Sequence, residues 1–199
     1  MTGSGVLGAA SAGTQTITNN NTLAIADGSG GLASNYTLSG ATINVTIIPR
    51  TLNVTLSREY DGTTAVSGAS LTPTFDSLQG GETLALSGTG SVSTANVGSS
   101  KAVSLGSIAL VAGSGNPSNY SLNSATMNVT QRVINLDGIR AYDATTNVLS
   151  SDINTFGNIV SGETLTISGT GSVGTNSVAM NKAITVGSLS LGNGLGLAS

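Results

Sequence analysis

The feature that most constrains this chain is a tandem repeat with a period of about 82 residues. The segment GETLALSGTGSV (81–92) returns as GETLTISGTGSV (162–173), and REYDGTT (58–64) returns as RAYDATT (140–146). A third, partial match pairs ASNYTLSGATINVT, from Ala33, with PSNYSLNSATMNVT, from Pro117. A period this long suits a string of small domains rather than the short rungs of a β-helix.

The repeat divides the chain into three copies. Residues 1–49 form the C-terminal half of a repeat (the first copy) and residues 50–131 a complete repeat (the middle copy). Residues 132–199 form the last copy, which lacks the final N-Y-x-L and A-T-x-N-V strands. The junctions at Pro49-Arg50 and Gln131-Arg132 contain no flexible linker, so we expect neighbouring copies to hold a fixed angle and to form a rod.

Alternating apolar residues predict β-strands within each copy. Leu52, Val54 and Leu56 alternate with polar residues, and Leu84 and Leu86 do the same. The 28 glycines and the 8% of charged residues fit strands and turns better than exposed helices. We therefore predict an all-β fold, with each repeat a small β-sandwich or one twisted sheet and at most one short helix per repeat, such as one near residues 150–160.

Composition excludes several classes of function. The chain has no Cys and no His, which removes thiol nucleophiles, histidine bases, disulfides and the usual zinc sites. Its six Lys and Arg residues are scattered and its net charge is −3, so it offers no basic stripe for nucleic acid. No apolar run is long enough to insert into a membrane. We expect no enzymatic activity, no catalytic residue, no cofactor and no metal.

A G-x-G-x-x-G spacing, formed by Gly169, Gly171 and Gly174, raises the alternative of a dinucleotide site. Such a site needs a helix directly after the glycines. Ser93 replaces the third glycine in the middle copy, and alternating residues follow in both copies. We interpret the glycines as a turn between strands.

The aromatic side chains all belong to the repeat signature, so we predict structural roles for them. Tyr60 and Tyr142 are expected to be mostly buried anchors, and no aromatic residue is left over for stacking on a sugar. The predicted signature also includes two aspartates; the full set is Tyr36, Tyr60, Asp61, Phe75, Tyr120, Tyr142, Asp143 and Phe156.

Two alternatives concern charged residues. Asp61 and Asp143 could bind calcium, but each lies almost alone, so we predict that they bond turn amides instead. Ala144 replaces Gly62, so we expect that the second turn does not use a positive φ. A Lys–Asn cross-link is a further hypothesis, disfavoured because Gln15 replaces the lysine in the first copy; its residues would be Lys101, Lys182, Glu82, Glu163 and Asn119. Asn-x-Ser/Thr sequons also occur, as a chain so rich in these residues produces by chance.

Several motifs recur in one order: Y-D-G-T-T, G-E-T, an LSGTGSV-like strand, V-G-x-x-K-A-V and N-Y-T/S-L. Together they resemble the YDG repeat, related to MBG repeats, of large bacterial surface adhesins of the filamentous-haemagglutinin-like, two-partner-secreted type. The resemblance implies a secreted, extracellular stalk at the cell surface, used in cell adhesion or biofilm matrix. Its contacts would be neighbouring repeats, with matrix polysaccharide or a host surface bound through other regions. The alternative is a module that itself binds a glycan or a host protein.

The two incomplete copies suggest a last hypothesis. The first copy consists of little more than the strands that the last copy lacks, so one molecule could complete another by head-to-tail self-association.

Overall fold

The structure, a computed structural model, describes residues 1–194. The all-β prediction is confirmed, with 45% of residues in strands and 6% in helical turns. Within residues 1–194 every helical segment is a 3₁₀ turn of three residues, too short to cross a membrane. Residues 195–199, the end of the predicted last copy, lie outside the described part.

The chain divides into two compact units, and the division runs through the middle copy. The 82-residue boundaries therefore remain a sequence-based prediction, and each unit is described by itself. Unit 1 comprises Met1–Leu56, Ala65–Ser91 and Ala102–Thr126, and unit 2 comprises Ser57–Thr64, Val92–Lys101 and Met127–Ser199.

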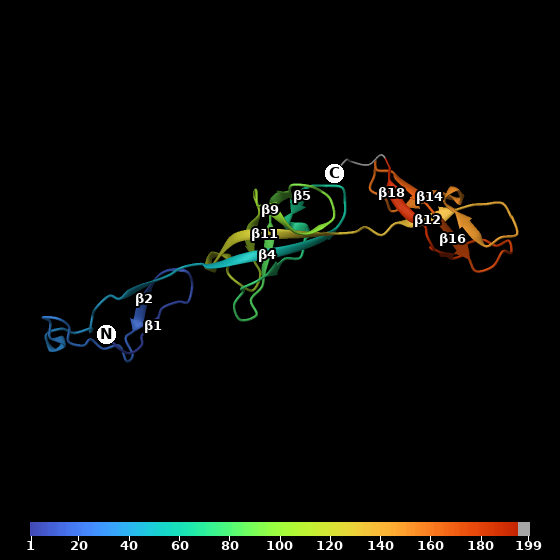
Figure 1. Cartoon of the computed structure of the whole chain (residues 1–199). Coiled ribbons are helices and arrows are strands. Elements are labelled where there is room, and N and C mark those ends of the chain that lie inside the picture. Colours follow the sequence, from blue (N-terminus) through green and yellow to red (C-terminus); the bar gives the residue numbers. More distant parts are fainter. Residues whose placement is uncertain (195–199) are drawn as a thin grey trace. The chain divides into compact units, whose positions relative to one another are not determined.

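The middle copy is built on a six-stranded sheet with the order β5-β8-β9-β11-β4-β6. Its two longest strands, β4 and β11, lie side by side (Figure 1). A separate pair is formed by β7 and β10, with Leu86 opposite Leu110. The strands are β4 (Arg50–Glu59), β5 (Ala65–Ser67), β6 (Thr74–Phe75), β7 (Leu84–Ser87), β8 (Thr89–Val92), β9 (Gly98–Ser104), β10 (Ala109–Ala112) and β11 (Tyr120–Thr130), and the 3₁₀ turns are η2 (Gly68–Ser70) and η3 (Pro117–Asn119).

Strands β4 and β11 run parallel. Asn53 accepts a hydrogen bond from Ser124 Oγ at 2.7 Å, and Thr55 and Thr126 share one at 3.3 Å. Thr130 Oγ1 donates to the Arg58 carbonyl at 3.3 Å, so the paired positions advance together along both strands. Parallel neighbours need a crossover connection, which the chain between them supplies.

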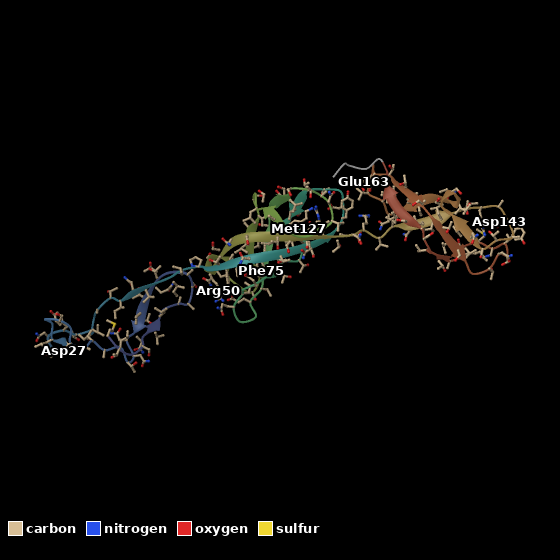
Figure 2. All side chains as sticks on the ribbon, viewed as in Figure 1. Asp27, Arg50, Phe75, Met127, Asp143 and Glu163 are labelled. Atoms are coloured by element: carbon tan, nitrogen blue, oxygen red, sulfur yellow. The ribbon has the colours of Figure 1, made fainter. Side chains whose placement is uncertain are left out.

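The period-2 pattern of β4 produces the core as predicted. Leu52, Val54 and Leu56 are fully buried, and the polar residues between them are exposed. Leu52 packs with Leu84 and Tyr120, and half-buried Phe75 packs against this cluster. From β11, Met127 (labelled in Figure 2) is fully buried, and Ala125 and Val129 are nearly so. Alternation at one residue in two therefore fills one face of the sheet with apolar side chains.

The last copy repeats these elements in the same register, but its sheet is in two parts. Val148 lies opposite Gly171 as Val66 lies opposite Gly90, and Leu165 lies opposite Asn193 as Leu84 lies opposite Ala112. No strand in residues 132–194 joins the β12-β14 pair to the β13-β16-β17 sheet. The elements are β12 (Asn135–Gly138), β13 (Asn147–Leu149), η4 (Ser150–Asp152), β14 (Ile153–Gly157), β15 (Leu165–Ser168), β16 (Thr170–Val173), β17 (Ile184–Thr185) and β18 (Ser190–Asn193).

Two predictions for the last copy can be compared with these elements. The short helix expected near residues 150–160 is only the single turn η4, and β14 follows it directly. Of the fingerprint glycines, Gly169 lies in a turn between β15 and β16, with φ +91°, as interpreted from the sequence, whereas Gly171 lies within β16 and Gly174 follows it. Ser188 Oγ and the Ser107 Oγ of the middle copy each accept a backbone bond at this turn.

The first copy contributes a three-stranded sheet, β1-β2-β3, in which Gln15 lies opposite Val45. Strand β3 is its edge, whereas the matching strand β11 has neighbours on both sides. The first copy has no buried apolar side chain, and the last copy has only Val148 and Ile153 within the described residues. The elements are β1 (Val6–Leu7), β2 (Gly13–Asn19), η1 (Ala33–Asn35) and β3 (Asn44–Ile47).

Truncation of Leu52 tests where the core lies. Leu52→Ala removes a fully buried side chain and is expected to cost about 2–5 kcal/mol. Ile134→Ala, at the matching position of the last copy, is the control and should cost less because Ile134 is only half-buried. Urea denaturation with hydrogen exchange of the β4 and β12 amides measures both changes. An equal loss at the two positions would contradict this placement of the core.

Candidate functional site

The Y-D-G-T-T signature forms a closed turn after β4. Asp61 Oδ1 accepts a hydrogen bond from the Thr63 amide at 3.0 Å, and Arg58 donates to the Thr63 carbonyl. Arg58 and Asp61 also form an ion pair at 3.1 Å. The aspartate therefore bonds a turn amide, as predicted, and the preceding arginine closes the same turn from the other side.

The last copy repeats this turn with Arg140 and Asp143 (the latter labelled in Figure 2). Thr145 N donates to Asp143 Oδ1 at 2.9 Å, and Arg140 pairs with Asp143 at 2.9 Å. The Thr145 amide holds the pKa of Asp143 below its ordinary range, since it stabilises the charged carboxylate. The paired Arg and Asp are thus a local structural device in both copies.

The expectation that Ala144 avoids a positive φ is wrong. Ala144 has φ +62° where Gly62 has φ +75°, so the turn keeps one conformation in both copies. The Arg-Asp-Thr bonds hold it there despite a cost of about 1–2 kcal/mol for a residue with a side chain.

The tyrosine of this turn contacts the following copy. Tyr60 Oη donates to Oε1 of Glu163, which lies in the G-E-T loop before β15 (Glu163 is labelled in Figure 2). This hydrogen bond, together with burial, raises the pKa of Tyr60, because removing the phenol proton would place two negative charges together. The tyrosine of the Y-D-G motif therefore donates a hydrogen bond from the middle copy to the last copy.

The other tyrosine motif bonds within its own copy. Tyr120 Oη donates to Oε2 of Glu82, and this bond raises the pKa of Tyr120. Glu82 and Glu163 occupy the same G-E-T position. One carboxylate position thus accepts from two kinds of tyrosine, in its own copy and in the copy before it.

Gly62 brings the two copies close together. A Cβ at Gly62 would lie 2.8 Å from Cγ1 of Val160, which is closer than side-chain atoms pack. A side chain at position 62 would therefore require Val160 to move, in addition to the cost of the positive φ.

Arg132 organises the same contact from the connecting segment. Its Nε donates to the Asn158 carbonyl and its Nη2 to Asn158 Oδ1, both at 2.7 Å. Nη1 reaches the Tyr60 carbonyl at 3.4 Å and Glu59 at 3.8 Å. The sequence analysis did not predict a role for Arg132 or Asn158. The recurrence of arginine at positions 50 and 132, where one copy connects to the next, was a signal for the arginine. We call the set Glu59, Tyr60, Gly62, Arg132, Asn158, Val160 and Glu163 the junction site.

A different contact joins the first copy to the middle copy. The Ala12 amide donates to Asn119 Oδ1 at 2.8 Å. Asn119 belongs to the N-Y motif, beside Tyr120. The N-Y motif of the middle copy and the G-E-T motif of the last copy therefore each receive a contact from the copy before.

The two lysines each tie down a loop. Lys101 Nζ donates to the Thr94 carbonyl at 2.7 Å and to the Asn96 carbonyl at 2.5 Å. Lys182 makes the matching bonds to Thr175 and Ser177. Both lysines therefore bond loop carbonyls, whereas Asn119 accepts from Ala12. This differs from the solvated strand-edge lysine expected from the sequence.

The predicted burial of Tyr142 is wrong, because its side chain is 65% exposed, and Tyr36 is 71% exposed. Their counterparts Tyr60 and Tyr120 are held by Glu163 and Glu82, and neither exposed tyrosine has such a carboxylate partner among the described contacts. Phe75 and Phe156 lie half-buried in β6 and β14. No group of three His, Cys, Asp or Glu side chains suited to a metal occurs in residues 1–194.

Comparison with known proteins gives one match. The model of the YDG domain family matches residues 46–127, so this part of the chain is similar to that family. No curated protein and no solved structure matches the chain.

The titration of Tyr60 tests its bond to Glu163. The raised pKa means that the contact is complete below pH about 10 and is lost as the pH rises through the raised value. Glu163→Gln removes the charge and should lower the pKa of Tyr60 toward its ordinary value, measured by ultraviolet absorbance of the ionised phenol. The same change in a Tyr60→Phe background is the control and should not alter the titration. An unchanged Tyr60 titration in Glu163→Gln would contradict the contact.

Substitution of Gly62 tests the close approach of the two copies. Gly62→Ala should lower the thermal stability of unit 2, since it adds a clash with Val160 to a conformational cost of about 1–2 kcal/mol. Gly81→Ala is the matched control, with φ +79° and open space around the added Cβ. Calorimetry should show a smaller loss for the control. Equal losses would mean that Val160 does not limit the position.

Proposed function

We propose that this chain is a set of structural, non-enzymatic repeats from the stalk of a bacterial extracellular adhesin. In this role the repeats project an adhesive region from the cell surface, in cell adhesion or in biofilm matrix. The match of residues 46–127 to the YDG domain family supports the proposal, together with the motifs that recur between copies.

The observation that carries the proposal is the bond between Tyr60 and Glu163. It uses the most characteristic residue of the Y-D-G motif for a contact with the next copy. The arginine and aspartate of the same turn bond each other, and both bond the backbone and the hydroxyl of Thr63. A motif that stabilises its own turn and also contacts the next copy is expected in a spacer, because a spacer is built from repeats held at a fixed spacing.

The junction site also favours restricted motion between copies. Arg132 bonds Tyr60 on one side and Asn158 on the other, and Gly62 allows direct packing against Val160. Short connections with several side-chain bonds hold neighbours more firmly than a Gly/Ser linker does. A stalk needs this property to keep its tip away from the cell.

Direct binding of a glycan is the second candidate, and the exposure of Tyr36 and Tyr142 favours it. Exposed aromatic rings are the side chains that stack on sugars. The corresponding tyrosines, Tyr120 and Tyr60, are less exposed and donate their hydroxyls to Glu82 and Glu163, so exposure is not common to every copy of these motifs.

Electron–electron distance measurements test the stalk. The chain has no cysteine, so Ala109→Cys and Ala183→Cys, both at exposed positions, allow clean spin labelling of the middle and last copies. We expect one narrow distance distribution that broadens in Glu163→Gln. Glu82→Gln is the matched control and should leave the distribution narrow, because the Glu82 bond lies within one copy. A distribution that is broad from the outset would contradict the stalk, and tight, saturable binding on a glycan array would favour the second candidate.

A further inference from the structure

The middle copy has an open strand edge at β10. Strand β7 pairs with β10 on one side, and in residues 1–194 no strand pairs with β10 on the other side. Ala109, Val111 and Ala112 are exposed, whereas Leu110 turns toward the core cluster. Because the amides and carbonyls of a strand point alternately to its two sides, those of every second residue in β10 point away from β7 and have no strand to bond.

This edge lacks the features that usually protect an edge strand. Such strands are commonly very short, or they carry lysine, proline or a bulge. The two edges of the six-stranded sheet, β5 and β6, contain only three and two residues. Strand β10 has four residues, reads Ala-Leu-Val-Ala, and pairs with β7 without a shift in register. No charged residue occurs between Lys101 and Arg132, so β10 can accept a further strand without burying a charge of its own segment.

The apolar edge is not a general property of the repeat. Strand β18 occupies the matching position in the last copy and reads Ser-Leu-Gly-Asn. Gly192 takes the place of Val111 in the register, and Asn193 takes the place of Ala112. A valine at this position is therefore not needed to form the strand pair. Val111 is nevertheless 39% exposed in the middle copy, which suits a contact outside that copy.

We propose that β10 pairs antiparallel with β10 of a second copy of this chain. A two-fold axis passes through Val111, so the Val111 side chains of the two molecules lie opposite each other. Residue numbers paired across this axis differ by an even number, so each outward amide of one β10 lies opposite an outward position of the other. The β7-β10 pairs of the two molecules then form one continuous sheet with the order β7-β10-β10-β7.

Charge and symmetry favour a second copy as the occupant. The chain has a net charge of −3, which opposes self-association through its charged surfaces. Residues 102–131 carry no charge, and Glu82, which precedes β7, is bonded to Tyr120. An isologous contact needs only one self-complementary surface, which β10 provides. A strand of four residues buries less area than a stable interface, so we expect the dimer to form at high protein concentration.

Sedimentation equilibrium of the full chain tests the pairing. The mass should rise with concentration from 19.4 kDa and level off at twice that value, because a two-fold contact is closed. Val111→Lys should keep the chain monomeric, since it places two like charges opposite each other. Val97→Lys is the matched control, because Val97 is 50% exposed between β8 and β9, and it should leave the dimer intact. A mass of 19.4 kDa at every concentration, a mass that passes twice this value, or equal effects of the two substitutions would overturn the proposal.

Hydrogen exchange of the unmodified chain keeps the test valid if Val111→Lys unfolds the middle copy. Exchange of the outward β10 amides should slow as the protein concentration rises, because these amides become bonded in the dimer. The amides of β18, at the matching positions of the last copy, should exchange at an unchanged rate. Equal slowing in β10 and β18, or no slowing in β10, would overturn the proposal. None of these outcomes bears on the Tyr60 contact that supports the stalk.

Discussion

The architecture depends on one strand, β11, which connects the two halves of a repeat. It lies between β9 and β4, and it supplies Met127, Ala125 and Val129 to the core of the middle copy. In the last copy no strand of the described residues takes this position. The other strands have the same pairs and register there, form separate sheets, and include only Val148 and Ile153 as buried apolar side chains. Local pairing is thus fixed by turns and alternation, whereas closure of the core needs the crossover strand.

A second dependence runs between copies through the G-E-T glutamates. Glu82 accepts from a tyrosine of its own copy and Glu163 from a tyrosine of the preceding one, and a carboxylate has lone pairs for more than one such bond. Where copies follow one another, the same carboxylate can accept both bonds. The folding of a repeat and its attachment to the previous repeat are then coupled, as in other arrays whose stability depends on nearest neighbours.

Much of the fold was predictable because it depends on local sequence patterns, namely the alternation of apolar residues and the clusters of turn residues. The alternation of Leu52, Val54 and Leu56 predicts β4 and its buried face, and the asparagine, aspartate and glycine clusters predict the turns. The contacts of Tyr60 were not predictable, since its partner lies 103 residues away and the sequence gives no sign of which glutamate it meets. The burial predicted for Tyr142 from the repeat signature was wrong, and Tyr60, which shares that signature, is half-buried, because burial depends on neighbouring residues and not on the motif. At Ala144 the local bonds decide instead: the turn has the same positive φ as the turn at Gly62, although alanine disfavours that conformation.

The parallel arrangement of β4 and β11 has a mechanical consequence. The chain enters the middle copy at the start of β4 and leaves it at the end of β11, and the two strands are neighbours that run in the same direction. A pull on the two ends of the copy therefore acts along these strands and slides one against the other. Their hydrogen bonds are loaded in shear and must break together, whereas a hairpin pulled from its open end unzips one bond at a time. Under flow or tension the repeat would resist extension through its longest pair of strands.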